Sequence, residues 1–126
     1  MSKKRILIMD DEELIQDVLS TMLDFLGYEV DIASEGAKAI QMYKNAMTEN
    51  KRYDVIIMDL TIPGGIGGKE AINDLIDIDS DVNAIVSSGY TNDPVMSNYS
   101  EYGFRGVISK PFNIEELEKV LNGIIR

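Results

Sequence analysis

Four short apolar stretches of this sequence each end on polar side chains that could take part in chemistry. One ends on two carboxylates, the next on a single carboxylate, the third on two hydroxyls and the last on an ammonium group. In chain order these residues are Asp10 and Asp11, Asp59, Ser87 and Ser88, and Lys110. In open parallel sheets, ligands and reacting groups gather at the carboxyl ends of the strands. If the four stretches are neighbouring parallel strands, these side chains meet at one edge of the sheet.

Such a group of side chains favours a bound cation and chemistry on a phosphoryl group. Carboxylates held about 4 Å apart repel one another by roughly 4 kcal/mol per pair at an effective dielectric constant near 20. A divalent ion that prefers oxygen ligands relieves this repulsion, and Lys110 adds a fixed positive charge beside it. A hydroxyl and an ammonium that face a metal-bound carboxylate form a site for a tetrahedral oxyanion. Asp59 is then a candidate nucleophile toward phosphorus, which would give an aspartyl phosphate.

The composition excludes several other kinds of site. A chain of 126 residues with 44% hydrophobic content is long enough for one globular domain with a full core. It contains no cysteine, which excludes disulfides, thiolate zinc sites and thiol nucleophiles, and no histidine, which excludes serine–histidine triads. The commonest transition-metal ligand is therefore missing as well. Any bound metal is expected to be a hard ion such as Mg²⁺.

The charge of the chain bears on its partners and its location. There are 22 acidic residues against 12 basic ones, a net charge of -10. This balance disfavours nucleic acid or an anionic membrane as a direct partner, because both require a basic surface. The apolar run near the N-terminus is too short for a signal peptide or a membrane span. We therefore expect a cytoplasmic location and a single domain over residues 1–126.

The rest of the chain alternates between strand and helix patterns. Unbroken apolar runs rich in β-branched residues indicate strands buried on both faces, whereas the alternation in Tyr28–Ala33 indicates a strand near an edge. Residues at the helical period separate the strands, and this pattern is weakest and most polar in Asp93–Tyr102. The expected strands are Ile6–Met9, Tyr28–Ala33, Val55–Met58, Val82–Ser88 and Gly106–Ser109. Repeated strand–helix units predict an α/β fold with a parallel sheet and helices on both faces.

Several of these signals also have ordinary structural interpretations. The acidic residues after Met9 suit the start of a helix, and a lysine before proline, as at Lys110, is simply biased to an extended backbone. The run Gly64–Gly68 lacks the lysine and the spacing of a phosphate-binding loop and is interpreted as a mobile turn. Asn113 is expected to cap the last helix, with Glu116 completing a capping box. Each signal is modest alone, but their arrival at successive strand ends favours one functional site.

The combination of these motifs resembles the receiver domain of two-component signalling. The motifs that carry the resemblance are Asp10-Asp11, Asp59, Ser88 and Lys110-Pro111-Phe112, and their set covers essentially the whole chain. The stretches LTIPGGIGGKEAI and SSGYTND look most like receivers associated with hybrid sensor histidine kinases. The resemblance implies a flavodoxin-like, doubly wound sheet of five parallel strands in the order 2-1-3-4-5. We also expect a single receiver domain with no effector domain.

The resemblance further implies a role for each motif in phosphoryl transfer. Asp59 would accept a phosphoryl group from a phosphohistidine on a sensor histidine kinase or a histidine phosphotransfer domain. Lys110 would pair with the phosphoryl oxygens, and its bond to Pro111 would be cis. Ser88, rather than Ser87, matches the switch hydroxyl. The chain would catalyse its own phosphorylation and dephosphorylation without separate turnover. The resemblance also allows a dimer that forms on phosphorylation.

A magnesium site is part of the same implication. By motif match, Asp11, Asp59 and the backbone carbonyl of Thr61 would bind Mg²⁺, with Asp10 acting largely through water. Mn²⁺ is the alternative ion.

The sequence departs from the family pattern at one position, and two other classes of protein offer rival interpretations. The family usually has an aromatic residue three positions before the lysine, where this chain has Val107, so the aromatic switch is absent or replaced. A phosphatase of the haloacid-dehalogenase type would need a second aspartate at the position of Thr61. A flavin-binding module of the flavodoxin type would need a phosphate loop where Asp10 and Asp11 would repel phosphate.

Overall fold

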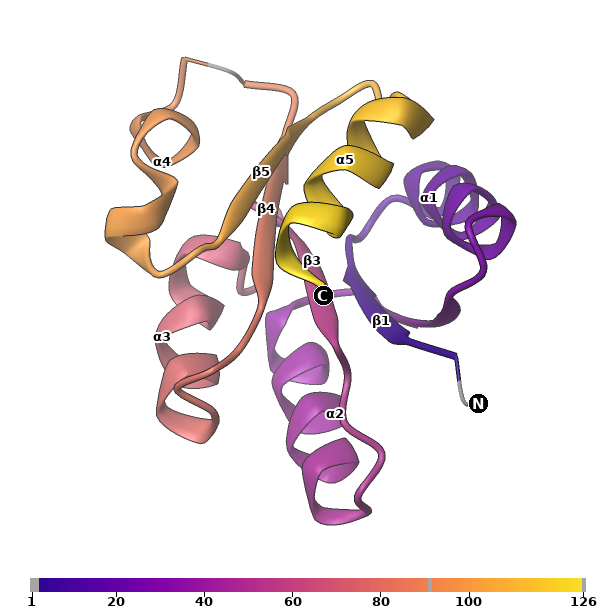
Figure 1. The fold of residues 1–126 in the computed structure, drawn as a ribbon. Helices are drawn as coiled ribbons and strands as arrows, with labels where there is room; N and C mark the ends of the chain where they lie inside the picture. The colour runs from indigo at the N-terminus through magenta and orange to yellow at the C-terminus, as the bar shows by residue number, and fades with distance from the viewer. Residues whose placement is uncertain (1–2, 91, 126) are drawn as a thin grey trace.

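Five parallel strands form the centre of the molecule, in the order β2-β1-β3-β4-β5; Figure 1 labels β1, β3, β4 and β5. The computed structural model describes residues 3–90 and 92–125. The strands are β1 Arg5–Met9, β2 Glu29–Ala33, β3 Val55–Asp59, β4 Ala84–Ser88 and β5 Gly106–Ser109. All pairings are parallel. The expected flavodoxin-like order and the placement of β2 at an edge are therefore confirmed.

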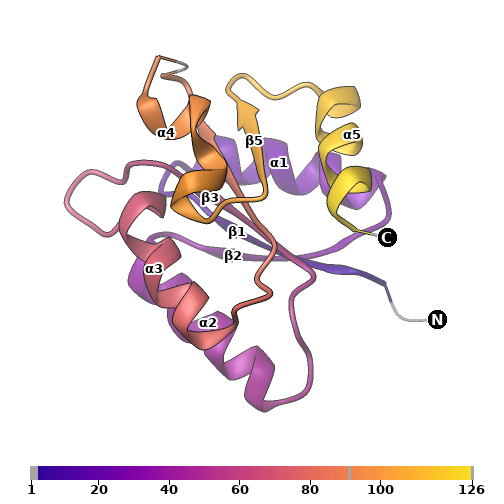
Figure 2. The ribbon, with the colours of Figure 1, turned by 60° about the vertical axis from the view of Figure 1, so that its left-hand side comes forward.

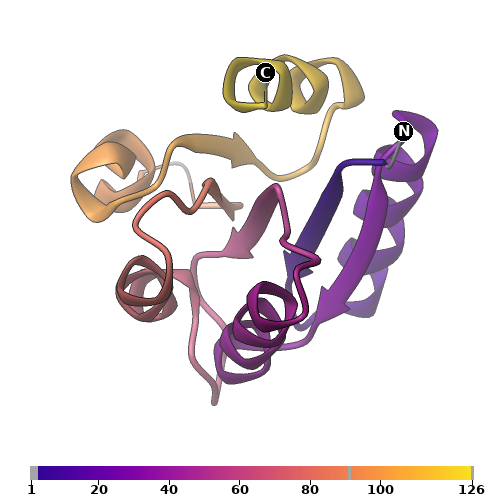
Figure 3. The same cartoon turned by 60° about the horizontal axis from the view of Figure 1, so that its bottom comes forward.

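Helices cover both faces of the sheet, as Figure 3 shows. They are α1 Glu13–Phe25, α2 Gly36–Thr48, α3 Gly68–Ile78, α4 Pro94–Ser97 and α5 Ile114–Ile124, with a 3₁₀ helix at Tyr99–Tyr102. Helices α1 and α5 lie on one face, while α2 and α3 lie side by side on the other (Figure 2). No helix in the described ranges is long and apolar enough to cross a membrane.

Alternate residues of each central strand enter two separate hydrophobic clusters. In β1, Ile6 and Ile8 pack with α1 and α5, whereas Leu7 and Met9 pack with α2 and α3. Side chains of a strand point to opposite faces in turn, so a strand covered on both sides needs an unbroken apolar run. This is why the central strands lack the polar alternation that β2 retains.

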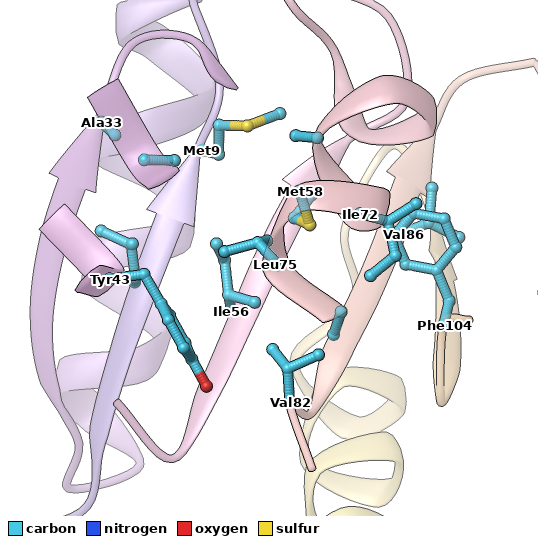
Figure 4. Packing of buried hydrophobic residues seen from close by; sticks show 14 of the residues in the cluster. Met9, Ala33, Tyr43, Ile56, Met58, Ile72, Leu75, Val82, Val86 and Phe104 are labelled. Carbon is cyan, nitrogen blue, oxygen red and sulfur yellow. The ribbon is translucent and has the colours of Figure 1, made fainter. Parts of the chain in front are cut away.

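The cluster beneath α2 and α3 is the larger of the two, and Figure 4 shows part of it. Tyr43 of α2 and Leu75 of α3 lie over Ile56 of β3, and Phe104 closes the cluster beside Val86. Tyr43 keeps its hydroxyl satisfied by donating a hydrogen bond of 2.7 Å to Asp79. Burial and this bond raise the pKa of the Tyr43 phenol.

The segment expected as one helix over Asp93–Tyr102 is divided. Asp93 caps a single turn by accepting a hydrogen bond from the Val95 amide at 2.9 Å, and Pro94 occupies the first helical position. Asn98 then leaves the helical region, with φ -118° and ψ 36°, before the 3₁₀ turn. Only Val95 and Met96 of the turn are buried. A continuous helix was therefore the wrong prediction for this segment, because two buried side chains give too short an apolar stripe to extend it.

Candidate functional site

The parallel register brings the polar strand ends together. Asp59, the last residue of β3, pairs with Ser87 of β4, and Ser88 pairs with Ser109 of β5. Lys110 follows at once, and its amide donates a hydrogen bond of 3.0 Å to the Ser88 carbonyl. The expected convergence at one edge of the sheet is thus observed.

Lys110 lies between two carboxylates from different strands. Its Nζ is 2.9 Å from Oδ2 of Asp10, 100 residues away in the chain, and 3.5 Å from Oδ2 of Asp59. Burial alone would lower the pKa of the Lys110 ammonium, but the hydrogen bond to Asp10 and the charge of Asp59 raise it above its ordinary value. Lys110 is therefore a fixed cation at this site, and its bond to Pro111 is cis, as expected.

Asp59 is held where its negative charge is unfavourable. The residue is 7% exposed, and burial together with the charges of Asp10 and Asp11 raises its pKa from 3.8 to about 6, while Lys110 opposes the rise. The single ammonium therefore offsets only part of the desolvation and repulsion. Near neutral pH most Asp59 side chains are ionised and carry uncompensated negative charge.

An acidic cluster stands at the end of β1. Asp10, Asp11 and Glu12 each offer a carboxylate oxygen, and these oxygens lie within 4.8 Å of one another. The Glu12 amide also donates a hydrogen bond of 2.9 Å to Oδ1 of Asp10. Glu12 was missing from the candidates chosen by sequence, where it was assigned only to the start of a helix. Its position directly after two strand-end carboxylates was the available signal.

A cavity of about 340 Å³ opens over these groups. The candidates chosen by sequence that line it are Asp11, Asp59, Thr61, Ser88 and Lys110. Glu12, Pro63, Gly89 and Tyr90 complete the lining.

Two other candidates lie outside the lining. Asp10 is 2% exposed and reaches the site through Lys110, and Ser87 is equally buried. Ser88 is as buried as Ser87, but of the two serines only Ser88 lines the cavity. Its Oγ accepts a hydrogen bond of 2.9 Å from the amide of Tyr90, which leaves the hydroxyl proton available to a ligand.

A larger cavity, of about 560 Å³, lies at the opposite end of the strands. Basic residues dominate its lining: Lys3, Lys4, Arg5, Lys51 and Arg52. Two of these are held by carboxylates, since Arg5 pairs with Asp31 at 2.9 Å and Arg52 with Asp79 at 2.6 Å. Size alone therefore does not identify the functional site, and the smaller cavity holds the converging carboxylates, hydroxyl and ammonium.

The donor set of the smaller cavity fits a hard divalent cation. The carboxylates of Asp11, Glu12 and Asp59 line this cavity, together with Thr61, which follows β3. These residues therefore offer oxygen atoms as metal ligands. Burial, together with the charges of Asp10 and Asp11, raises the pKa of Asp59. The cavity lining carries three carboxylates against the one ammonium of Lys110, which leaves an excess of negative charge. Oxygen ligands and excess negative charge are what Mg²⁺ requires.

The chain belongs to the response regulator receiver domain family, whose profile matches residues 6–122. The chemotaxis protein CheY of Thermotoga maritima is 30% identical over 122 residues, which cover 96% of this chain and 97% of that protein. Three further curated relatives, described as transcriptional regulators, are longer, and the chain spans about half of their length. The resemblance to receiver domains of two-component signalling is thus confirmed, which leaves the two rival classes without support.

Solved structures agree with this assignment. The receiver domain of a Pseudomonas aeruginosa sensor histidine kinase, with a magnesium ion in its active-site cleft, has a TM-score of 0.85 at 26% identity and covers 98% of both chains. The response regulator TrrA of Thermotoga maritima, in complex with Mg²⁺ and beryllofluoride, has a TM-score of 0.80 at 30% identity, covering 97% of this chain and 99% of that one.

The position that departs from the family pattern lies inside the fold. Val107 of β5 pairs with Val86 of β4 and packs against the cluster beneath α2 and α3. Tyr99 and Tyr102 of the 3₁₀ helix pack against the same cluster. The aromatic side chains of this region are therefore carried by the segment before β5 and not by the strand position that the family usually uses.

Proposed function

We propose that Asp59 is the phosphoacceptor of this receiver domain and takes its phosphoryl group from a phosphohistidine on a partner protein. The observation that supports this most is the position of Asp59 in the cavity, with Lys110 Nζ 3.5 Å from its Oδ2. A nucleophilic carboxylate there has a cation beside it to receive the phosphoryl oxygens. The donor must lie on another molecule or domain, since these 126 residues contain no histidine.

The proposed transfer forms one bond and breaks one bond. An Asp59 carboxylate oxygen attacks phosphorus, the P–N bond of the phosphohistidine breaks, and the imidazole leaves with the bonding electron pair and takes up a proton. Lys110 and the Ser88 hydroxyl donate hydrogen bonds to the phosphoryl oxygens, which stabilises their charge in a partly enclosed site. Asp59 suits the nucleophilic role because its pKa of about 6 leaves it mainly ionised at pH 7.

The proposed metal ligands are Asp11, Asp59 and the backbone carbonyl of Thr61, with Asp10 acting through water. Glu12 adds a further carboxylate at the mouth of the same cavity. A bound Mg²⁺ would supply charge stabilisation to the phosphoryl oxygens, and Mn²⁺ would be accepted by the same oxygen ligands. The magnesium ions in the two related receiver structures support this assignment.

The partner is proposed to be a sensor histidine kinase or a histidine phosphotransfer domain. The exchange is assigned to the cytoplasm. Association with a hybrid kinase is favoured by the likeness to the sensor kinase receiver. Phosphorylation is proposed to change partner binding, including the formation of a dimer.

Intact-mass measurement after incubation with acetyl phosphate tests the proposed acceptor. Wild-type protein with Mg²⁺ should gain the mass of one phosphoryl group, and protein treated with EDTA should gain much less. Asp59→Asn should gain none, while Asp74→Asn, which changes an exposed carboxylate on α3, should label like wild type. Equal labelling of Asp59→Asn would place the acceptor elsewhere.

A further inference from the structure

Two glycines at the start of α3 lie against the backbone that leads out of β3. A Cβ on Gly67 would stand 2.5 Å from the Leu60 carbonyl oxygen and 2.9 Å from Cα of Thr61. A Cβ on Gly68 would stand 2.9 Å from the carbonyl oxygen of Asp59. The backbone of Gly67, with φ -90° and ψ -175°, is open to any residue. Position 67 therefore requires a glycine because the neighbouring backbone is too close for a side chain, and not because of its backbone angles.

The same loop is held from its other side by α2. The amide of Gly36, the first residue of α2, donates a hydrogen bond of 2.7 Å to the Ile66 carbonyl. Added bulk at Gly36 would meet that oxygen at 2.5 Å. The Gly67 amide is fixed in turn by Oε1 of Glu70 at 3.1 Å. The run Gly64–Gly68, interpreted from the sequence as a mobile turn, is thus anchored at its C-terminal end.

These contacts fall on the backbone beside the proposed metal ligands. Thr61 contributes a carbonyl, whose position depends on the course of the chain and not on a side-chain rotamer. The preceding residue, Leu60, is tied to β4 by a hydrogen bond of 2.9 Å from its amide to the Ser87 carbonyl. Gly67 packs against the Leu60 carbonyl and Thr61, immediately after this hydrogen bond. The direction in which the chain leaves β3 is therefore limited by β4 on one side and by Gly67 on the other.

We infer that Gly67 is a positioning residue for the metal site, setting the backbone of Leu60 and Thr61 so that the Thr61 carbonyl meets the cation that Asp11 and Asp59 bind. Gly68 supports it by close contact with the Asp59 carbonyl. This inference rests on the proposed function, because it assigns the purpose of the contact to the proposed Mg²⁺ site.

Titration calorimetry with Mg²⁺ alone tests the inference. In Gly67→Ala the new methyl group overlaps the Leu60–Thr61 backbone, and we expect that backbone to shift, which moves the Thr61 carbonyl relative to the carboxylates. Loss of support around a metal ligand typically weakens affinity by about ten- to a hundredfold, and we expect the Kd for Mg²⁺ to rise by about tenfold or more. Labelling by acetyl phosphate should then need a correspondingly higher Mg²⁺ concentration.

A matched control separates positioning from general loss of stability. Gly103 has φ +102°, and a Cβ there would stand 2.4 Å from Cδ1 of Ile76, so Gly103→Ala is also strained but lies outside the cavity lining. It should lower the melting temperature while leaving the Kd for Mg²⁺ within about twofold of the wild-type value. Gly123→Ala, where no atom lies within 4 Å of the added Cβ, should leave the Kd unchanged and keep the melting temperature at or above the wild-type value, because alanine favours a helix.

The outcomes distinguish failure of the inference from failure of the proposed function. Wild-type protein that does not bind Mg²⁺ would overturn the proposed metal site. Wild-type binding with an unchanged Kd in folded Gly67→Ala, or an equal loss in Gly103→Ala, would overturn the positioning role alone. If circular dichroism shows that Gly67→Ala is unfolded, Gly68→Ala, with its longer contact, decides the matter by the same titration: a raised Kd supports the role and an unchanged Kd rejects it.

Discussion

Asp59 is surrounded by groups that oppose its ionisation, and one lysine compensates for only part of them. Full compensation would leave an inert ion pair, whereas a shortage of positive charge leaves a carboxylate that a bound cation would stabilise. The Lys110 contact of 3.5 Å to Asp59 is longer than its 2.9 Å contact to Asp10. The ammonium is thus anchored mainly by Asp10, which leaves the proposed acceptor oxygen less tightly held.

The sequence predicted most residues of this site because each follows a recognisable strand. Asp11, Asp59, Ser88 and Lys110 line the cavity as expected. Glu12 was missed because its direction depends on the turn after β1, where its amide bonds back to the Asp10 carboxylate. A backbone turn of this kind is set by local geometry that an apolar pattern does not encode.

The lifetime of the proposed aspartyl phosphate depends on side chains at the cavity mouth. Water must approach phosphorus opposite Asp59, and Thr61 and Tyr90 line that cavity, with Tyr90 76% exposed. Neither hydroxyl is an effective base near neutral pH, so we expect slow hydrolysis. The double variant Thr61→Asn with Tyr90→Glu should lose its phosphoryl group about tenfold faster, which corresponds to about 1.4 kcal/mol in the barrier.

Intact-mass measurement over time after removal of acetyl phosphate gives this rate. The single variant Tyr90→Phe retains the ring and removes only the hydroxyl, so it should decay like wild type. A double variant that decays no faster than wild type would show that water access at Thr61 and Tyr90 does not set the lifetime.

At the scale of the elements, strands were more predictable than the short helix before β5. A strand buried on both faces needs an unbroken apolar run, and such a run is visible in one sequence. The segment Asp93–Tyr102 places only Val95 and Met96 in the core as part of α4. With this short apolar stripe the helix does not continue past Asn98, and the sequence pattern alone does not show which side chains of the segment are buried. The contact between Gly67 and the β3 exit was unpredictable for the same reason.

The cap of α5 provides a test at this scale. Oδ1 of Asn113 accepts hydrogen bonds from the amides of Glu115 at 2.9 Å and Glu116 at 3.1 Å. The reverse bond of the expected capping box, from the Asn113 amide to Glu116, is not among the hydrogen bonds of the described residues. Asn113→Ala should lower the free energy of unfolding by about 1 kcal/mol, because two amides lose their acceptor.

Urea unfolding followed by circular dichroism measures this loss. Asn73→Ala is the matched control, because Asn73 is exposed within α3 and alanine favours a helix interior. The control should leave the protein as stable as wild type or slightly more stable. An equal loss in both variants would argue against a capping role for Asn113.

At the scale of the whole molecule, opposite charges collect at opposite ends of the sheet. The carboxyl ends of the strands carry the acidic cluster of Asp10, Asp11 and Glu12, while the larger cavity at the other end is lined by five basic residues. These basic residues lie at the other end of the sheet from the acidic cluster. Water and salt screen charges over such distances, so they do not neutralise the carboxylates of the site. Lys110 supplies part of the compensation at the site, and the proposed Mg²⁺ would supply more.

This arrangement predicts how the stability of the metal-free protein depends on pH. The pKa of Asp59 is about 6 in the folded protein, whereas the ordinary pKa of an aspartate is 3.8. Between these two pH values the folded state therefore binds more protons than the unfolded state. Asp59 therefore lowers the free energy of unfolding above pH 6, and this effect vanishes below about pH 4. Asp59→Asn cannot ionise, and its stability relative to wild type should rise by roughly 2–3 kcal/mol from pH 4 to pH 7.

Urea unfolding of both proteins in EDTA, at intervals across this pH range, measures the difference. Taking the difference between variant and wild type removes the titration of groups that the two proteins share, such as Asp79, whose pKa is lowered by hydrogen bonds from Tyr43, the Asp81 amide and Arg52 against the effect of burial. Saturating Mg²⁺ at pH 7 should reduce the advantage of Asp59→Asn, because the ion stabilises the folded wild-type protein that binds it. A difference that stays constant from pH 4 to pH 7 would mean that Asp59 is not held in an unfavourable electrostatic environment.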